Sequence, residues 1–134
     1  ADLLNSRFTV EVNQVECSLL HLESFLDGTL EYCQQHHIKP MAWSPLGAGN
    51  LFAETDDERI QRISAVAGIL AEKYNTSADA ILYSWILTHP SGIHPVTGTT
   101  KPERIHLASE ALNIKMERED WFMLWRASTG KEVA

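Results

Sequence analysis

Residues 38–49 read Ile-Lys-Pro-Met-Ala-Trp-Ser-Pro-Leu-Gly-Ala-Gly. The first part, Ile38 to Ser44, is a short apolar run that stops at Pro45, which is typical of a buried β-strand. Gly47 and Gly49 then break the pattern. The stretch therefore predicts a strand whose carboxyl end opens into a loop of small residues.

Two further strand patterns lie on either side of this segment. Phe8 to Glu16 alternates aromatic or β-branched side chains with polar ones, and such alternation predicts a strand. Ile93 to Thr97 predicts a short third strand, although Pro95 lacks the amide hydrogen that a β-ladder uses. Gly98 marks the end of that strand.

Helical patterns separate and follow the strands. The expected helices run from a cap at Asp27 to about His37, from a capping box at Thr55 and Glu58 through Tyr74, from a cap at Ser77 to Pro90, from a capping box at Thr100 and Glu103 to about Leu112, and from about Glu117 to Ser128. In the second helix, one apolar stripe recurs at helical spacing and is predicted to be buried, at Ile60, Ile63, Ala67, Leu70 and Tyr74.

Strands that alternate with helices in this way run parallel, because each connection crosses over the sheet. Three strands do not close a sheet. A complete (β/α)8 barrel takes about 250 residues, whereas this chain has 134. We therefore expect an α/β fold that is half of a (β/α)8 TIM barrel, in one partial domain over residues 1–134. The start at Ala1, without methionine, suggests a processed or truncated chain.

Composition excludes several classes of function. The net charge is −7 and the eleven Lys and Arg residues are scattered, so a nucleic-acid partner is not expected. No apolar run approaches the roughly 20 residues of a membrane span. Cys17 and Cys33 fit neither a zinc spacing nor a disulfide framework, and the histidines lack ligand spacing, so no metal site is expected. Reduced thiols in a cytoplasmic protein are the expectation.

A short segment whose residues are suited to ligand binding follows each predicted strand. These segments are Asn13-Gln14-Val15-Glu16, Ala42-Trp43-Ser44-Pro45-Leu46-Gly47-Ala48-Gly49 and Gly98-Thr99-Thr100-Lys101-Pro102-Glu103-Arg104. The carboxyl ends of parallel strands lie on one rim, where barrel enzymes place their chemistry. In this order and at these intervals, the segments resemble the last three strand ends of the aldo-keto reductase family. The resemblance covers nearly the whole chain and implies the C-terminal half of that barrel.

The first two segments suit a nicotinamide ring. Gln14 offers a donor and acceptors at a strand end, as a carboxamide requires, and the resemblance implies that role. Trp43 precedes a Ser-Pro turn, where its ring can lie flat at the rim, and the resemblance implies that it stacks on the nicotinamide. The alternatives are a solvent-facing strand glutamine and a core tryptophan.

Small residues in the second segment let a phosphate approach the main chain. Ser44, Leu46 and Gly47 resemble family positions whose hydroxyl and backbone amides hold the pyrophosphate of the cofactor. Ala48, Gly49 and Asn50 can extend this loop over the cofactor. A Ser-Pro-Leu-Gly turn is common in itself, so the assignment depends on its neighbours.

The third segment predicts an anion site. Thr99, Thr100, Lys101 and Arg104 gather at a strand end and a helix N-terminus, where amides and cations favour a phosphate. The resemblance implies that this segment holds the 2′-phosphate of NADP through Gly98, Thr99, Thr100, Lys101 and Arg104, with the arginine stacking on adenine. The alternative is a solvated helix face with two cations.

The chain departs from the family's pattern at three positions near this site. Many members have lysine where Gly98 stands, and Glu and Asn where this chain has Leu107 and Ala108. These differences put the adenine contacts and part of the preference for NADP over NAD in doubt.

The catalytic residues implied by the family lie outside the resemblance. Its Asp, Tyr, Lys and His, and a Ser-Asn pair that also binds the carboxamide, belong to the first five strands, and no catalytic residue is expected in this chain. The expected function is therefore the cofactor half of an NADP-dependent reductase of small-molecule aldehydes or ketones, completed by a missing N-terminal half or by self-association. Alternatives are a non-catalytic NADP-binding module and a phosphate-binding fragment of another barrel.

Overall fold

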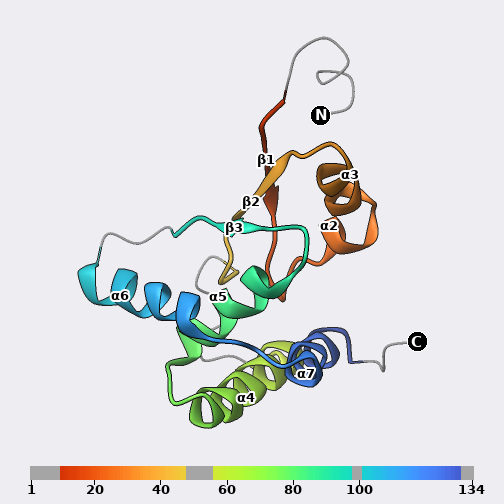
Figure 1. Cartoon of the computed structure of the whole chain (residues 1–134). Coiled ribbons are helices and arrows are strands. Elements are labelled where there is room, and N and C mark those ends of the chain that lie inside the picture. The colour runs from red at the N-terminus through yellow and green to blue at the C-terminus, as the bar shows by residue number, and fades with distance from the viewer. Residues whose placement is uncertain (1–9, 48–55, 98–100, 131–134) are drawn as a thin grey trace.

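The computed structural model describes residues 10–47, 56–97 and 101–130. Three strands, β1 (Val12–Glu16), β2 (Lys39–Trp43) and β3 (His94–Pro95), form one parallel sheet in the order β1-β2-β3. Helical crossovers connect them, as parallel pairing requires (Figure 1). The α/β fold and the three parallel strands that the sequence predicts are confirmed.

Within the described residues, each crossover contains two α-helices, and so does the segment after β3. They are α2 (Glu23–Leu26) and α3 (Thr29–Gln35), α4 (Glu58–Lys73) and α5 (Ala78–Thr88), and α6 (Pro102–Glu110) and α7 (Arg118–Thr129), with a 3-10 turn η2 (Ala111–Asn113) between the last two. The sequence predicts five of these helices and misses α2, a single turn whose N-terminus has no side-chain cap.

The expected strands are longer than the observed ones. β1 begins at Val12 rather than at Phe8, which lies outside the described residues, and β3 keeps only two of the five expected residues. Pro95 supplies the physical reason in β3, because it has no amide hydrogen to donate to the ladder. The amide of Val96 nevertheless donates to the carbonyl of Ala42, 2.8 Å away, so the pairing extends one residue further.

Two helix starts differ from the capping boxes that the sequence predicts. α4 begins after Asp57, whose carboxylate accepts from the amides of Arg59 and Ile60, so the cap is not at Thr55, which lies outside the described residues. α6 begins after Lys101, which makes no side-chain cap. A capping carboxylate directly before the first helical turn satisfies the free amides of α4 better than a hydroxyl two residues earlier.

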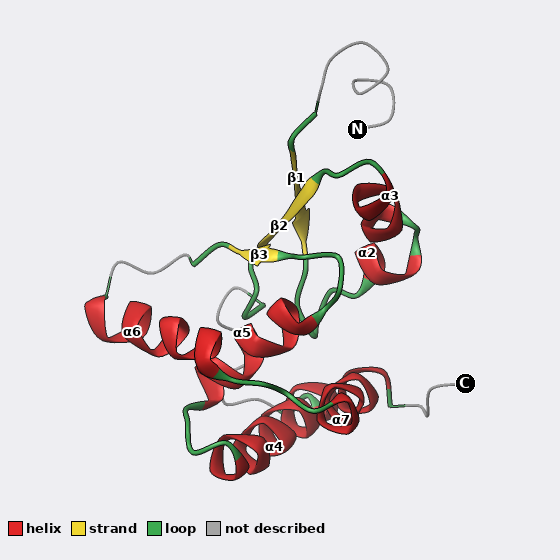
Figure 2. Ribbon diagram, viewed as in Figure 1, coloured by secondary structure: helices red, strands yellow, loops and turns green. Residues whose placement is uncertain are grey.

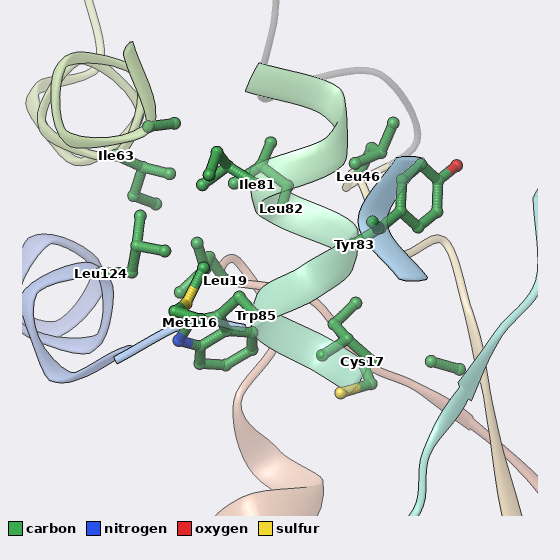
Figure 3. Packing of buried hydrophobic residues seen from close by; sticks show 14 of the residues in the cluster. Cys17, Leu19, Leu46, Ile63, Ile81, Leu82, Tyr83, Trp85, Met116 and Leu124 are labelled. Carbon is green, nitrogen blue, oxygen red and sulfur yellow. The ribbon is translucent and has the colours of Figure 1, made fainter. Parts of the chain in front are cut away.

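Helix α5 occupies the centre of the molecule, between the sheet and the pair formed by α4 and α7 (Figure 2). Seven consecutive residues of α5, from Ala80 to Ile86, are buried, so the helix is covered on all sides. Trp85 is completely buried, and Ile63 from α4 and Leu124 from α7 lie in the same cluster (Figure 3). The apolar stripe predicted for α4 is confirmed at Ile63, Ala67 and Leu70, which are buried, whereas Ile60 and Tyr74 at its two ends are half-buried.

Two arginines of α4 hold the C-terminal turn of α7. The Arg59 guanidinium donates to the carbonyls of Ser128 and Leu19, each at 2.9 Å, and Arg62 donates to the carbonyl of Ala127 at 3.0 Å. The last carbonyls of a helix have no partner within it, and cations there also oppose the negative end of the helix dipole. These contacts attach α7 to α4 and to the segment after β1.

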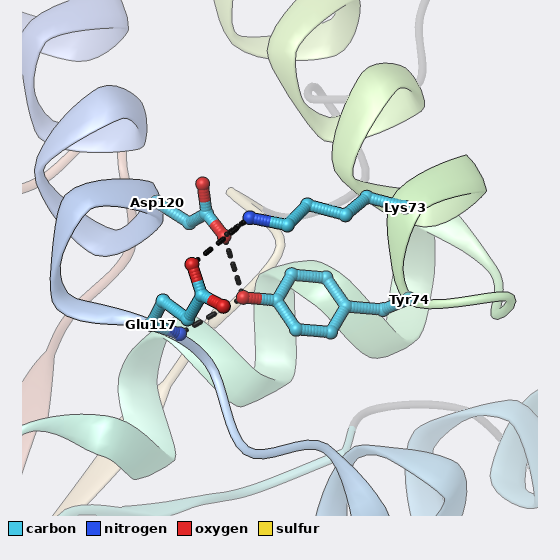
Figure 4. Close-up of polar contacts among 4 residues, drawn as sticks. All are labelled: Lys73, Tyr74, Glu117 and Asp120. Carbon is cyan, nitrogen blue, oxygen red and sulfur yellow. Dashed lines mark hydrogen bonds and ion pairs between the residues drawn. The ribbon is translucent and has the colours of Figure 1, made fainter.

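A polar cluster ties the other end of α4 to the start of α7 (Figure 4). The Lys73 ammonium lies 2.8 Å from Asp120 and 3.1 Å from Glu117, and the Tyr74 hydroxyl donates to Asp120 at 2.5 Å. The same hydroxyl accepts from the amide of Glu117. Burial by itself raises the pKa of Asp120, but the hydrogen bonds from Lys73 and Tyr74 and the lysine charge outweigh it, and the pKa is lowered.

We expect Asp120→Asn to lower the free energy of unfolding by about 1–2 kcal/mol at neutral pH, because the charge that Tyr74 and Lys73 bond is lost from a buried position. A carboxylate whose pKa is lowered in the folded state stabilises above its unfolded pKa, and that contribution is lost as the pH falls through the lowered value. The difference between variant and parent should therefore shrink as the pH falls below the ordinary aspartate value of 3.8.

Urea unfolding at neutral and acidic pH measures this effect. Glu117→Gln is the matched control, since its carboxylate is 60% exposed, and it should change stability little. Equal stability of the Asp120→Asn variant and the parent at neutral pH would contradict this stabilising role of Asp120.

Candidate functional site at the carboxyl ends of the strands

Gln14 and Trp43 lie on the same face of the sheet. In the parallel register Gln14 pairs with Met41 and Glu16 pairs with Trp43, so Gln14, Glu16, Met41 and Trp43 all point to one side. Pro40 and Ala42 point to the other side, where they are buried by the helices. Gln14 and Trp43 are exposed, the latter by 44%, so Trp43 is not the core tryptophan that the sequence left open. The exposure of Gln14 fits both of its interpretations, a ligand contact and a solvent-facing strand residue.

The turn after β2 has an unusual backbone. Ser44 has φ = 50° and Gly47 has φ = 63°, and the amide of Gly47 donates to the carbonyl of Ser44 at 2.9 Å. A positive φ is uncommon in a residue other than glycine and is often kept at functional sites. The geometry closes a tight turn directly after Trp43.

Leu46 and Gly47 have different constraints in this turn. The Leu46 side chain is buried in the core and anchors the turn to the body of the protein. The amide of Gly47 already donates within the turn, so a pyrophosphate would have to share or displace that hydrogen bond. A backbone bond also fixes the start of the turn, since the amide of Cys17 donates to the carbonyl of Trp43 at 3.3 Å.

The third predicted segment is described only in part. Gly98, Thr99 and Thr100 lie outside the described residues, while Lys101 precedes the first turn of α6 and Arg104 lies within it. The Arg104 guanidinium is 3.5 Å from the carboxylate of Asp79, in the first turn of α5. Its side chain remains 39% exposed, so an incoming anion can reach it in competition with that carboxylate.

Two features of this rim were not predicted from the sequence. The carboxylate of Glu16, in register with Trp43, lies 3.1 Å from Nε2 of His21, and a short antiparallel bridge between Ser18 and His21 shapes the loop. Asp79 contacts Arg104 although 25 residues separate them. No local pattern indicates the second contact, whereas the nearness of Glu16 and His21 in the sequence is a weak signal for the first.

Neither cysteine is placed for nucleophilic chemistry. Both thiols are free and buried, and Cys17 follows β1 directly. Burial raises the pKa of Cys17 to about 11, with a hydrogen bond to Ser24 opposing the shift, so the group stays a thiol at neutral pH.

The described ranges contain neither a metal cluster nor a helix suited to a membrane. No three His, Cys, Asp or Glu side chains there lie close enough together to hold a metal ion. None of the helices in those ranges combines the length and the apolar character that a membrane span requires.

Residues 3–127 match the model of the Aldo/keto reductase family. The chain belongs to this family. The reductases most relevant to it include Oxidoreductase YdhF of Escherichia coli, 42% identical over 134 residues, covering 98% of this chain and 44% of the relative. A 6-dehydroglucose reductase of Agrobacterium fabrum is 42% identical, covering 91% of this chain and 40% of the relative. An NADPH-dependent alpha-keto amide reductase of Saccharomyces cerevisiae is 33% identical, covering 82% and 34%.

Solved aldo-keto reductases have the same fold over the matching part. The thermostable reductase Tm1743 superposes with a TM-score of 0.79 at 18% identity, covering 94% of this chain and 43% of the other. The Gox0644 D53A mutant, crystallised with NADPH, gives 0.70 at 20% identity, covering 94% and 41%. The chain thus spans about 40% of the length of the reductases that it matches.

Proposed function

We propose that this aldo-keto reductase chain forms the NADP(H)-binding part of a carbonyl reductase barrel. The observation that carries the proposal is the shared open face of Gln14 and Trp43, directly beside the strained turn at Ser44. An amide side chain and a flat ring on one face offer hydrogen bonds and a stacking surface to a nicotinamide carboxamide and ring.

The adenosine end of the cofactor would bind at the third segment. Arg104 supplies a charge-assisted contact for the 2′-phosphate, and Lys101 and the first amides of α6 add to the attraction for an anion. Gly98, Thr99 and Thr100 complete this proposed site. The yeast relative described as NADPH-dependent supports the choice of NADP(H).

We also propose that the chain itself carries no proton donor for the substrate. Its three tyrosines, Tyr32, Tyr74 and Tyr83, all lie on or beside helices rather than on a strand of the sheet. Burial raises the pKa of Tyr83, with Asp79 adding to the shift and Arg104 opposing it. Residues 1–134 and a further segment would together form the barrel, and that further segment would supply the remaining catalytic groups. The alternative is that the chain serves as a non-catalytic NADP-binding module.

Binding of two ligands separates the two ends of the proposed site. We expect Gln14→Ala and Trp43→Ala to weaken NADPH by about tenfold, from lost stacking and hydrogen bonding. The same variants should leave 2′,5′-ADP, which has no nicotinamide, unchanged. Fluorescence titration measures both ligands.

Val12→Ala is a matched control, because Val12 lies on the same open face two residues before Gln14 and is 45% exposed. NADPH affinity should be unaffected by that change. Parallel losses for NADPH and 2′,5′-ADP in the Trp43 variant would indicate a folding defect or a different site.

A further inference from the structure

A second cavity lies away from the proposed cofactor rim, on the helical side of the molecule. It is an open cavity of about 570 Å³, lined by α2, the C-terminal end of α5, Met116 and α7. The volume falls in the range of about 300–1,000 Å³ that is usual for small-molecule sites.

Aromatic rings form the walls of this cavity. Trp121 and Trp125 line it and are stacked on each other, with centroids 5.6 Å apart and planes 17° apart, and Phe25 stands edge-on to Trp125 at 5.8 Å. Trp85, which is buried in the core, completes a cluster of three rings, because its centroid lies 4.9 Å from that of Trp121 and 6.4 Å from that of Trp125.

Reciprocal hydrogen bonds hold Trp85 and Trp121 in place. The indole of Trp121 donates to the carbonyl of Trp85 at 2.8 Å, and the indole of Trp85 donates to the carbonyl of Trp121 at 3.1 Å. The polar atoms of both rings are thereby used within the protein, so Trp121 presents an apolar, preorganised wall to a ligand. Flat walls of this kind favour a planar aromatic ligand.

The cavity has two charged or titratable side chains, and both are basic. Of the ten residues that line it, Arg118 and His89 are the only charged or titratable ones, and none is acidic, in a chain whose net charge is −7. Arg118 lies over the ring of Phe122, with its guanidinium carbon 5.8 Å from the ring centroid, which directs the cation along the aromatic surface.

His89 is oriented to donate a hydrogen bond. Both contacts with Ser91 meet at Nδ1: the Ser91 hydroxyl lies 2.7 Å from it, and the Ser91 amide donates to it at 3.2 Å. Because a backbone amide can only donate, we assign Nδ1 as the acceptor and the proton of the neutral ring to Nε2. Burial lowers the pKa of His89, with Glu31 opposing the shift, so the neutral ring is the main form at pH 7. The Nε2–H group of His89 is thus a second hydrogen-bond donor for a ligand, in addition to the guanidinium of Arg118.

From these contacts we propose that the cavity binds a small planar aromatic carboxylate. The rings would lie against Trp121 and Trp125, and the carboxylate would accept from Arg118 and from Nε2 of His89. The proposal does not depend on the cofactor site, since no residue of that site lines the cavity.

The test uses 2-naphthoate and its neutral analogue 2-naphthylmethanol as probes of the purified chain, followed by calorimetry and by tryptophan fluorescence. We expect saturable binding of naphthoate, with the neutral analogue about fivefold weaker or more, since one partly exposed ion pair adds about 1 kcal/mol. Arg118→Gln should remove that preference. Lys115→Gln is the charge-matched control, because it removes a nearby exposed cation that does not line the cavity.

The position of binding is checked separately. NADPH should not displace naphthoate, whatever the outcome at the cofactor rim, and Leu26→Trp, at an exposed edge of the cavity, should block the probe. The proposal is overturned if naphthoate does not bind saturably, if the two probes bind equally, or if Arg118→Gln and Lys115→Gln have the same effect.

Discussion

The purified chain is expected to show no reduction of a reactive aldehyde such as a nitrobenzaldehyde, even where it binds NADPH. Hydride transfer leaves an alkoxide-like oxygen, and a positioned proton donor or oxyanion partner contributes about 10²–10⁴-fold to such steps. Gln14, Trp43 and Arg104 can orient a cofactor, but their contacts are nearly equal in the ground and transition states. Such contacts lower the free energy of binding without lowering the chemical barrier.

Loss of NADPH absorbance measures this activity. A polypeptide that supplies the earlier strands of an aldo-keto reductase barrel, added in trans, should restore turnover if the two parts close one barrel. Binding of NADPH without turnover in the completed barrel would favour the non-catalytic module instead. Clear turnover by the chain alone, abolished by a substitution within it, would contradict our assignment of the proton donor to another segment.

The second large effect is expected at Arg104. Replacing it by alanine should weaken NADPH by about tenfold to a hundredfold, since a hydrogen bond to a charged group contributes roughly 1.5–3 kcal/mol. NADH should be affected much less, because only NADPH carries the 2′-phosphate that a guanidinium can grip. Fluorescence titration of both cofactors in the completed barrel measures the difference.

Asp79 provides the opposite variant. Its carboxylate lies 3.5 Å from the Arg104 guanidinium and competes with a phosphate for it. Asp79→Asn should therefore strengthen NADPH binding modestly while leaving NADH unchanged. Equal weakening of both cofactors by Arg104→Ala, or no response to Asp79→Asn, would assign Arg104 to a structural contact with α5.

The order of elements follows from local patterns in the sequence. Ser77 caps α5 through the amide of Ala80, as the sequence predicts, and Gly130 caps the C-terminus of α7 with φ = 72°. Each of these signals acts over four residues or fewer, because capping and helical spacing are properties of neighbouring residues. Two of the predictions that were wrong, the cap at Thr55 and the length of β3, also depend on neighbouring residues. The carboxylate of Asp57 caps α4 in place of Thr55, and Pro95 shortens β3.

Locating the candidate site required both the local patterns of the sequence and the tertiary structure. The sequence by itself determined which residue types follow each strand, and hence that Gln14, Trp43 and Arg104 belong near one rim. Only the tertiary structure decided that Gln14 and Trp43 share an open face, that Asp79 contacts Arg104, and that three tryptophans stack beside a cavity. These arrangements depend on strand register and on packing between residues far apart in the chain, such as Trp85 and Trp121, which no local periodicity encodes.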